Sequence, residues 1–570
     1  MSSLNPRIIL WIALAVVLYL NYEAWTRDYA PPPAVTSSGA AANGAGSLGN
    51  SVPQAASTPA VEAPTSAPPV APPAAAAPAA APGAPAPSGL SPTAPKVRVL
   101  TDVLDLDISL QGGTLERADL LRYPKVKGGQ ELVRLMNTDP ATLYLLESGL
   151  FKPGDPKRPT QLAEFTSPQK EYRLGTASEL RVPLTWTDGN GVTVTKTFIF
   201  HPGSYRIDLQ YDVDNRSSMP WQAAPYAQLH RIEPITKRSF ITTNVENYAY
   251  HGPAIRDEAD KYKKLPITNS DNANRDIKTR NGWIAALQHH FVGAVVPPPT
   301  ELYNITLRVQ GQEYVLGAQG PMMTIAPGQT ARLSQTLFVG PKLQAQLKET
   351  GTELNRVADY GLLYPLAAPL FWLLSKVHAL FGNWGFAIVT VTFLLKLAFY
   401  PLSEASGRSM AKMKLLGPRI KTLQETYKDD REKLGRAMMD LYKREKVNPV
   451  AGCVPMLLQI PVFLAFYWVL LETVEMRQAP FVGWINDLSS RDPFFVLPLI
   501  MAAAMFAQYK LNPAPPDPVQ AKVFMFMPFV MSVMFAFFPA GLVLYWVTNT
   551  LLTIAQQWNI NRRIEASKKT

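Results

Sequence analysis

The sequence predicts a multi-domain membrane protein: an all-β sandwich domain followed by an α-helical five-span core and preceded by one N-terminal span. Three observations predict this class. Apolar and polar residues alternate with period two within residues 96–343, as in half-buried strands. Long apolar runs gather after Leu362 and at the amino terminus, although the overall hydrophobic fraction of 47% is ordinary. A Pro/Ala-rich stretch separates the first run from the alternating region.

Residues 1–29 contain a short apolar run, residues 8–22, behind Arg7. Such a run is either a cleaved signal peptide or a retained transmembrane signal anchor. No small-x-small cleavage site follows directly, because the next residues read EAWTRDY. We therefore interpret the segment as a retained anchor, with the amino terminus in the cytoplasm.

Residues 30–95 are rich in Pro, Ala, Ser and Gly and carry almost no charge. A segment of this composition cannot bury a hydrophobic core, so a disordered or polyproline-like tether is predicted.

Residues 96–343 are predicted to form an antiparallel β domain of two packed sheets. The alternation is clear in residues 104–110 and 205–213 and weaker in 302–309, and turn signals such as DGNG at 188–191 separate such runs. Five of the six histidines lie in this region, none at metal-ligand spacing with cysteines or acids. They are interpreted as surface or core residues, and no cofactor is predicted.

Residues 344–382 are predicted to contain an amphipathic helix that lies on the membrane surface. An apolar stripe includes Leu366, Leu370 and Val377, and Pro365 and Pro369 interrupt the pattern. A spanning helix is the alternative.

Residues 383–560 hold five candidate spans, which with the anchor make six. The candidates are residues 384–402, 453–471, 494–509, 523–538 and 542–558. Several are shorter than the roughly 20 residues that a typical bilayer requires. Short spans can thin the surrounding bilayer, which is a possible functional property.

The distribution of charge predicts the topology. Residues 403–448 and the tail, 561–570, are strongly basic, whereas 472–493 is mainly acidic. The positive-inside rule places the two basic segments in the cytoplasm and the acidic one outside. The β domain is therefore predicted to lie outside the cytoplasm, which in a bacterium with this layout is the periplasm. One cysteine, Cys453, excludes an intrachain disulfide.

Within 403–448, apolar residues lie on one face of two helices joined at 428–430, which predicts a cytoplasmic helical hairpin. Its charge fits either a solvated face beside anionic lipid or a docking site for ribosomal RNA or a membrane protein awaiting insertion. The net charge of +11 does not choose between them.

The stretch TFLLKLAFYPL places Lys396 inside a predicted span. A charge at bilayer depth costs roughly 2.5–3.5 kcal/mol on insertion scales. Lys396 lies 12 residues beyond Trp384, about 18 Å along a helix, so its side chain could snorkel to the cytoplasmic headgroups. The alternative is a hydrated cavity between helices.

Several polar residues in the spans could line such a cavity. They are Thr392, Gln459, Thr548, Asn549 and Thr550. Any one of them alone is more typical of helix–helix contacts. Together they predict a hydrophilic groove around a lone cation, because no acidic residue lies inside any predicted span.

Four stretches resemble the YidC membrane-protein insertase family: MAKMKLLGPRI, YKREKVNPVAGCVPMLLQIPVFLAFYWVL, EMRQAPFVGWINDLSSRDP and FFPAGLVLYWVTN. KVRVLTDVLDLDISLQGGTLERADLLRYPK is similar to the start of the family's periplasmic domain in Gram-negative bacteria. The resemblance covers nearly the whole chain except the tether.

The resemblance implies an insertase of new inner-membrane proteins that acts alone or with the Sec translocon, and not an enzyme. It implies a β-supersandwich similar to sugar mutarotases, without their chemistry. It also implies a groove open to the cytoplasm, with its positive charge at Lys396 and polar positions at Thr392, Gln459, Tyr545 and Trp546. The implied partners are nascent membrane proteins, SecYEG and SecDF-YajC, the lipid bilayer and, through the basic hairpin and tail, the ribosome. Arginine is the commoner residue in such relatives, and lysine keeps its charge without its planar fork.

Three other classes of protein fit the sequence less well. A solute transporter predicts internal repeats and paired intramembrane charges, and neither is found in the sequence. A membrane enzyme needs a nucleophile with a base, and Cys453 has no histidine within the spans. A scaffold that only holds the β domain does not require polar groove residues.

Overall fold

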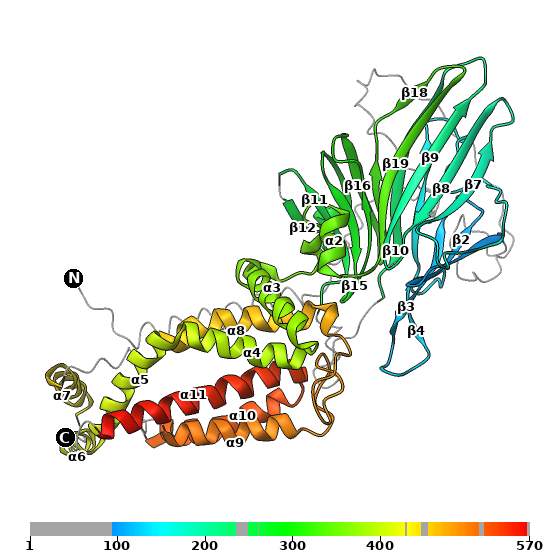
Figure 1. The fold of residues 1–570 in the computed structure, drawn as a ribbon. Coiled ribbons are helices and arrows are strands. Elements are labelled where there is room, and N and C mark those ends of the chain that lie inside the picture. The colour runs from blue at the N-terminus through cyan, green and yellow to red at the C-terminus, as the bar shows by residue number, and fades with distance from the viewer. Residues whose placement is uncertain are drawn as a thin grey trace, which may run out of the picture.

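The computed structural model describes residues 94–234, 249–259, 261–427, 430–445, 454–511 and 518–566 (Figure 1). The predicted anchor, the tether up to residue 93, Cys453 and the last residues of the tail lie outside these described residues. Figure 1 shows the strands gathered in one body and the long helices in another, with α2 and α3 between them.

The larger sheet has 11 strands. Its main path runs β13-β16-β17-β10-β5-β3-β2-β1-β6, with β18 paired to β10 and β4 paired to β3. The strands are β1 Lys96–Leu100, β2 Leu104–Ser109, β3 Leu115–Pro124, β4 Leu132–Met136, β5 Tyr144–Phe151, β6 Glu171–Arg173, β10 Trp221–Ile232, β13 Asn274–Thr279, β16 Tyr303–Gln310, β17 Glu313–Gln319 and β18 Met323–Ile325.

The smaller sheet has 8 strands in the order β12-β11-β14-β15-β19-β9-β8-β7. Its strands are β7 Leu180–Thr187, β8 Val192–Phe200, β9 Arg206–Asn215, β11 Gly252–Asp257, β12 Lys261–Lys264, β14 Trp283–Leu287, β15 Phe291–Val296 and β19 Gln329–Pro341. A short 3-10 helix, η3 Ser270–Asn272, precedes β13.

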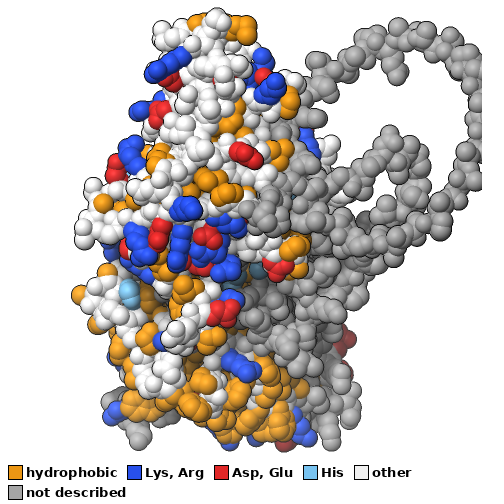
Figure 2. Space-filling model, turned by 90° about the vertical axis from the view of Figure 1, so that its right-hand side faces the viewer, with side chains coloured by type: hydrophobic (Ala, Val, Ile, Leu, Met, Phe, Trp, Pro, Cys, Tyr) orange, Lys and Arg blue, Asp and Glu red, His pale blue; other side chains and the backbone are white. Residues whose placement is uncertain are grey.

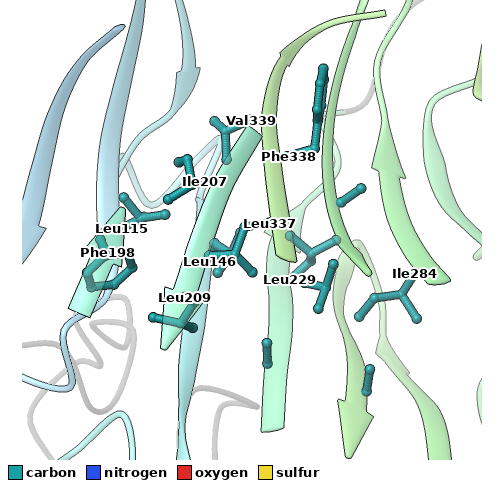
Figure 3. Close-up of a cluster of buried hydrophobic side chains, with 14 of the residues drawn as sticks. Leu115, Leu146, Phe198, Ile207, Leu209, Leu229, Ile284, Leu337, Phe338 and Val339 are labelled. Atoms are coloured by element: carbon teal, nitrogen blue, oxygen red, sulfur yellow. The ribbon is translucent and has the colours of Figure 1, made fainter. Parts of the chain in front are cut away.

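The core lies between these two sheets (Figure 3). Ile207 and Leu209 of the smaller sheet and Leu146 and Leu229 of the larger one are fully buried in a single cluster. The predicted two-sheet sandwich is therefore confirmed, and the three alternating runs of the sequence correspond to β2, β9 and β16. The DGNG turn connects β7 to β8 as expected.

The segment after the sandwich is divided rather than one helix. It consists of α2 Gln344–Thr350, η4 Leu354–Val357, η5 Gly361–Leu363 and α3 Tyr364–Phe381. Pro365 stands in the first turn of α3, where its missing N–H costs nothing, and Pro369 lies inside the helix. From the predicted stripe, Leu370 and Leu374 are buried, whereas Leu366 is exposed.

The helical body contains the segments predicted as spans. Its elements are α4 Trp384–Ala398, α5 Tyr400–Leu415, α6 Gly417–Thr426, α7 Arg431–Arg444, α8 Val454–Glu472, η7 Val474–Met476, α9 Val496–Leu511, α10 Pro518–Phe535 and α11 Ala540–Ala566. Of the described helices, none is by itself long and apolar enough to cross a membrane. One pair, Trp384–Ala398 with Tyr400–Ser409, meets that test jointly across a 65° bend.

The predicted cytoplasmic hairpin has one more break than expected. Its first helix is interrupted at Leu416, where α5 ends and α6 begins, because Gly417 and Pro418 follow directly. Buried Leu416 and Ile420 pack with Tyr442 of α7, so a small apolar cluster holds α6 against α7.

The sandwich contacts the helical body at the segment that follows α8. Arg477 donates two hydrogen bonds of 3.0 Å to the carbonyl oxygen of Pro124. The backbone N–H of Gln344 donates to Glu475, and Lys342 lies 3.7 Å from Glu472. The acidic segment 472–493 and the sandwich therefore lie on the same side of the helical body.

The two bodies differ in their surfaces. In Figure 2, hydrophobic side chains crowd the lower part of the molecule, while charged side chains are more frequent above. On α9 and α10 the exposed apolar side chains include Leu499, Val530 and Val533. The sandwich hides its apolar residues between its sheets, whereas the helical body displays many of them.

Candidate functional site

A groove lies where α4, α5, α8 and α11 meet. Its volume is about 470 Å³ when the open space at its mouth is counted. The lining is Thr392, Leu395, Lys396, Phe399, Leu402, Ser403, Gln459, Val462, Tyr545 and Asn549. We call this feature the cationic groove.

Lys396 is the cation of this groove. It is partly buried and stands in the last turn of α4, just before the 65° bend into α5. Free carbonyls at a helix C-terminus carry partial negative charge, which favours a cation in that turn. No carboxylate of the described residues forms an ion pair with Lys396. Its charge is therefore offset in part by its own helix and otherwise remains available to a ligand.

Gln459 and Asn549 form a hydrogen-bonded pair in the groove wall. The side-chain nitrogen of Gln459 donates to the side-chain oxygen of Asn549 at 2.6 Å, which joins α8 to α11. Each amide keeps further donor and acceptor capacity beyond this bond. The pair thus links two helices and also presents polar atoms to the groove.

Thr392 and Tyr545 line the groove but expose little of their surface to it. The hydroxyl of Thr392 donates to the carbonyl of Ile388 at 2.6 Å, so its one donor is used inside α4. Tyr545 is 2% exposed and stacks on Phe466 with a ring-centre distance of 4.5 Å. These residues form the floor of the groove rather than its rim.

Three predicted groove residues lie elsewhere, and one of them, Thr550, is 3% exposed. The ring of Trp546 packs between Phe463 and Phe535. The hydroxyl of Thr548 donates to the carbonyl of Leu544 at 2.8 Å. None of the three lines the cationic groove, because successive residues of α11 point in directions about 100° apart.

The remaining lining residues had weaker signals in the sequence, or none. Ser403 was assigned to the basic hairpin, yet it lines the groove together with Leu402. Its spacing of seven residues from Lys396, two helical turns, is a signal that could have found it. Leu395, Phe399 and Val462 carry no polar group and had no signal of their own.

This arrangement suits binding rather than bond chemistry. A half-buried ammonium group attracts negative charge more strongly than one in water, because the local dielectric constant is lower. The polar lining is otherwise neutral, with amides and a serine hydroxyl beside apolar side chains. The groove can therefore receive a polar or acidic segment next to apolar surface.

Comparisons with known proteins agree with this description. The family model of the "60Kd inner membrane protein" matches residues 376–568, and that of the "YidC periplasmic domain" matches residues 96–373. The chain is 43% identical to the membrane protein insertase YidC of Thioalkalivibrio sulfidiphilus, over 100% of each chain. It is also 43% identical to that of Nitrosococcus oceani, over 98% of this chain and 99% of the relative.

Solved structures give weaker likenesses. A YidC insertase crystal structure matches 82% of this chain and 93% of its own, with 18% identity and a TM-score of 0.38. A galactose mutarotase related enzyme from Lactobacillus acidophilus matches 43% of this chain and 97% of its own, with 8% identity and a TM-score of 0.30.

The fold, the groove and the family models define an inner membrane protein that joins a periplasmic β sandwich to a helical body with a cationic groove. The chain belongs to the YidC membrane protein insertase family. The family predicted from the sequence motifs is thereby confirmed. Members of this family are named as insertases and not as enzymes, which agrees with the predicted class.

Proposed function

We propose that this chain inserts newly made membrane proteins into the inner membrane through its cationic groove. The observation that carries the proposal is Lys396, placed in a groove between four helices without a carboxylate partner among the described residues. An unpaired charge at such a site is costly, so a functional role is the default expectation. The role follows from charge: Lys396 attracts the acidic or polar flank of an incoming segment.

The apolar part of the same segment requires a different surface. Exposed side chains of α10, such as Phe526 and Val530, and of α8, such as Ile460, offer one on the helical body. We propose that the segment slides along these faces while its flank contacts Lys396. The hydrated groove and the locally thinned bilayer together lower the free-energy barrier to insertion, and no nucleotide-binding site is needed.

The proposed topology has six spans, with both termini in the cytoplasm. The contacts of Arg477 and Glu475 with the sandwich support it, because they require segment 472–493 and the sandwich to share one side. The basic residues of α5, α6 and α7 support a cytoplasmic position for the hairpin.

Nascent membrane proteins are the proposed substrates, and SecYEG, SecDF-YajC and the ribosome are further proposed partners. The ribosome is proposed from the basic α6–α7 region, where Lys421 and Arg436 are exposed. Binding that depends on phosphate contacts should weaken steeply as salt rises.

The experiment is rescue of depleted cells with Lys396→Arg, Lys396→Met and Lys396→Glu at equal protein levels. The readout is insertion of one single-span substrate with an acidic tail. Lys510→Met at the end of α9 is the matched control, since Lys510 does not line the groove. We expect arginine and the control to support insertion, and methionine and glutamate to reduce it at least tenfold.

Two results would contradict the proposal. If all three Lys396 variants insert the substrate equally well, Lys396 only snorkels, and insertion rests on apolar surface and thinning. If a substrate with a neutralised flank depends on Lys396 as strongly as the acidic one, attraction of negative charge is not its role.

A further inference from the structure

The β sandwich caps the end of a helix that forms part of the cationic groove. α8 ends at Glu472, and the last carbonyls of a helix have no partner within it. One of them, the carbonyl of Leu471, accepts hydrogen bonds from the Nε2 of His289 at 2.9 Å and from the Nε2 of His290 at 3.2 Å. Both histidines lie in the turn between β14 and β15 of the smaller sheet. We call these two side chains the histidine cap.

The histidine cap satisfies this carbonyl fully. The two rings are buried and stack with their centres 3.8 Å apart. Burial lowers the pKa of His289 to about 3 and the pKa of His290 well below its usual value of 6.5, so both rings are neutral. A neutral ring carries one N–H, and a carbonyl oxygen has two lone pairs. The two donors therefore occupy both acceptor positions of the Leu471 oxygen.

A buried ion pair lies beside the histidine cap. The ammonium of Lys342, directly after β19, is 3.7 Å from the carboxylate of Glu472, and both side chains are buried. The backbone N–H of Lys342 donates to the carbonyl of His290 at 2.9 Å, which joins the ion pair to the cap. A cation is also favourable beside the free carbonyls of a helix C-terminus. The sandwich thus holds the last turn of α8 through neutral and charged contacts that are both shielded from water.

The held part of α8 also shapes the cationic groove. Pro461 interrupts the backbone hydrogen bonds of α8, and the helix after it runs without a further break to its end. Val462, in this part, lines the groove. Phe466 is fully buried and stacks on Tyr545 of the groove floor, with ring centres 4.5 Å apart. Only five residues, about 7.5 Å of helix, separate Phe466 from the capped Leu471.

We propose that His289 and His290 are positioning residues for the cationic groove. By holding Leu471 they hold Phe466, and Phe466 in turn holds Tyr545 of α11 in the groove floor. This inference rests on the proposed function of the groove and adds that the sandwich helps to set the shape of the groove. A partner that displaces the sandwich would then change the groove without contacting it.

Pulsed electron paramagnetic resonance on the full-length protein in liposomes tests this proposal. In a Cys453→Ser background, spin labels are attached at Leu464→Cys on α8 and at Leu551→Cys on α11. Both side chains are exposed, so the labels leave the packed core intact. The distance between the labels reports how α8 lies against α11. The histidine cap is changed in two ways: leucine at both positions removes the two donors, and glutamine at both positions keeps a side-chain N–H.

With leucine at both positions we expect the distance between the labels to shift by about 1–2 Å, the usual size of helix displacements at interfaces. Insertion of the acidic-tailed substrate should fall at least threefold. With glutamine both quantities should stay close to the parent values. Lys196→Met is the matched control, because Lys196 donates to three carbonyls elsewhere in the sandwich. If the histidines only stabilised the sandwich, this variant would produce the same shift.

The distance decides the inference, and insertion decides the proposed function. An unchanged distance with leucine, or an equal shift with glutamine or in Lys196→Met, would overturn the positioning role. If the double leucine variant does not fold, His289→Leu alone should give a smaller shift in the same direction, and no shift would overturn the role as well. If the distance shifts while insertion is unchanged, the histidines position α8 and the proposed role of the groove is wrong.

Discussion

The two bodies of this protein each hold a lysine away from bulk water, and they treat it in opposite ways. Lys196 of β8 is fully buried between the sheets, where its ammonium donates to the carbonyls of Gly112, Gly113 and Ser148 at 2.8–2.9 Å. All three of its donors are used. Lys396 of α4 lies in a groove with its charge free of any carboxylate of the described residues.

The difference separates a structural charge from a functional one. Lys196 connects the smaller sheet to the larger sheet, and its partners are built around it. Gly113 has a φ of +59°, and a Cβ at this position would lie 3.0 Å from the ammonium nitrogen. The described residues that line the groove around Lys396 are instead neutral polar and apolar side chains. A satisfied charge stabilises a fold, and an unsatisfied one is available to a ligand.

The largest expected effect comes from removing the satisfied charge. Lys196→Met keeps the length of the side chain but leaves three carbonyls without this donor. Because a buried acceptor that loses its partner costs about 1–3 kcal/mol, we expect the sandwich to lose roughly 3 kcal/mol of its free energy of unfolding. The measurement is a urea titration of the full-length protein in detergent, with tryptophan fluorescence as the signal that reports unfolding.

Lys396→Met is the matched control for that change. It should change the free energy of unfolding by less than about 0.5 kcal/mol while it lowers insertion. The comparison breaks down if Lys196→Met unfolds at the parent midpoint, or if Lys396→Met lowers stability as much as Lys196→Met does.

An intermediate case lies at the junction of the two bodies. Burial raises the pKa of Glu475 to about 7, and hydrogen bonds from its own backbone N–H and from that of Gln344, the latter of 3.2 Å, only partly oppose this effect. The unfolded carboxyl titrates near 4.5. The native state thus binds the extra proton between pH 4.5 and 7, so the contribution of Glu475 to stability falls as pH rises through that window.

Glu475→Gln should remove this dependence. Relative to the parent protein we expect little change at pH 4.5 and a gain of about 1–3 kcal/mol at pH 8, since one pKa unit corresponds to 1.36 kcal/mol. The difference between the two urea midpoints, measured across this range, isolates Glu475 from other titrating groups. A difference that is constant with pH would show that the pKa of Glu475 is the same in the native and unfolded states.

The sequence predicted the fold where patterns are local and repeated. Alternation identified β2, β9 and β16, and apolar runs identified α4 and α8 to α11. The pairing order of 19 strands was beyond reach, because period two fixes a face and not a neighbour. Lys196 occupies a core-facing position in the alternation of VTVTKTFIF, which is the sequence signal of a buried lysine.

Only part of the candidate site was predicted, again because a sequence pattern does not fix which side chains meet. Lys396, Thr392, Gln459 and Tyr545 come together from three helices as the resemblance implied. Trp546 and Thr548 do not, because one residue along a helix changes the direction of the side chain. Asn549 was named among the polar residues that could line a cavity, but its pairing with Gln459 was not predicted, because the two residues are 90 positions apart.

The smallest expected effect concerns this last pair, which resembles Lys196 in being satisfied and Lys396 in lining the groove. Gln459→Leu, Asn549→Leu and the double variant form a thermodynamic cycle. Hydrogen bonds between membrane helices average about 0.6 kcal/mol, so we expect a coupling of that size in detergent unfolding of the helical body. A coupling near zero, with insertion reduced by each single change, would mean that both amides act on water or substrate. Gln459 and Asn549 in the groove wall would then be functional polar groups together with Lys396, rather than structural ones.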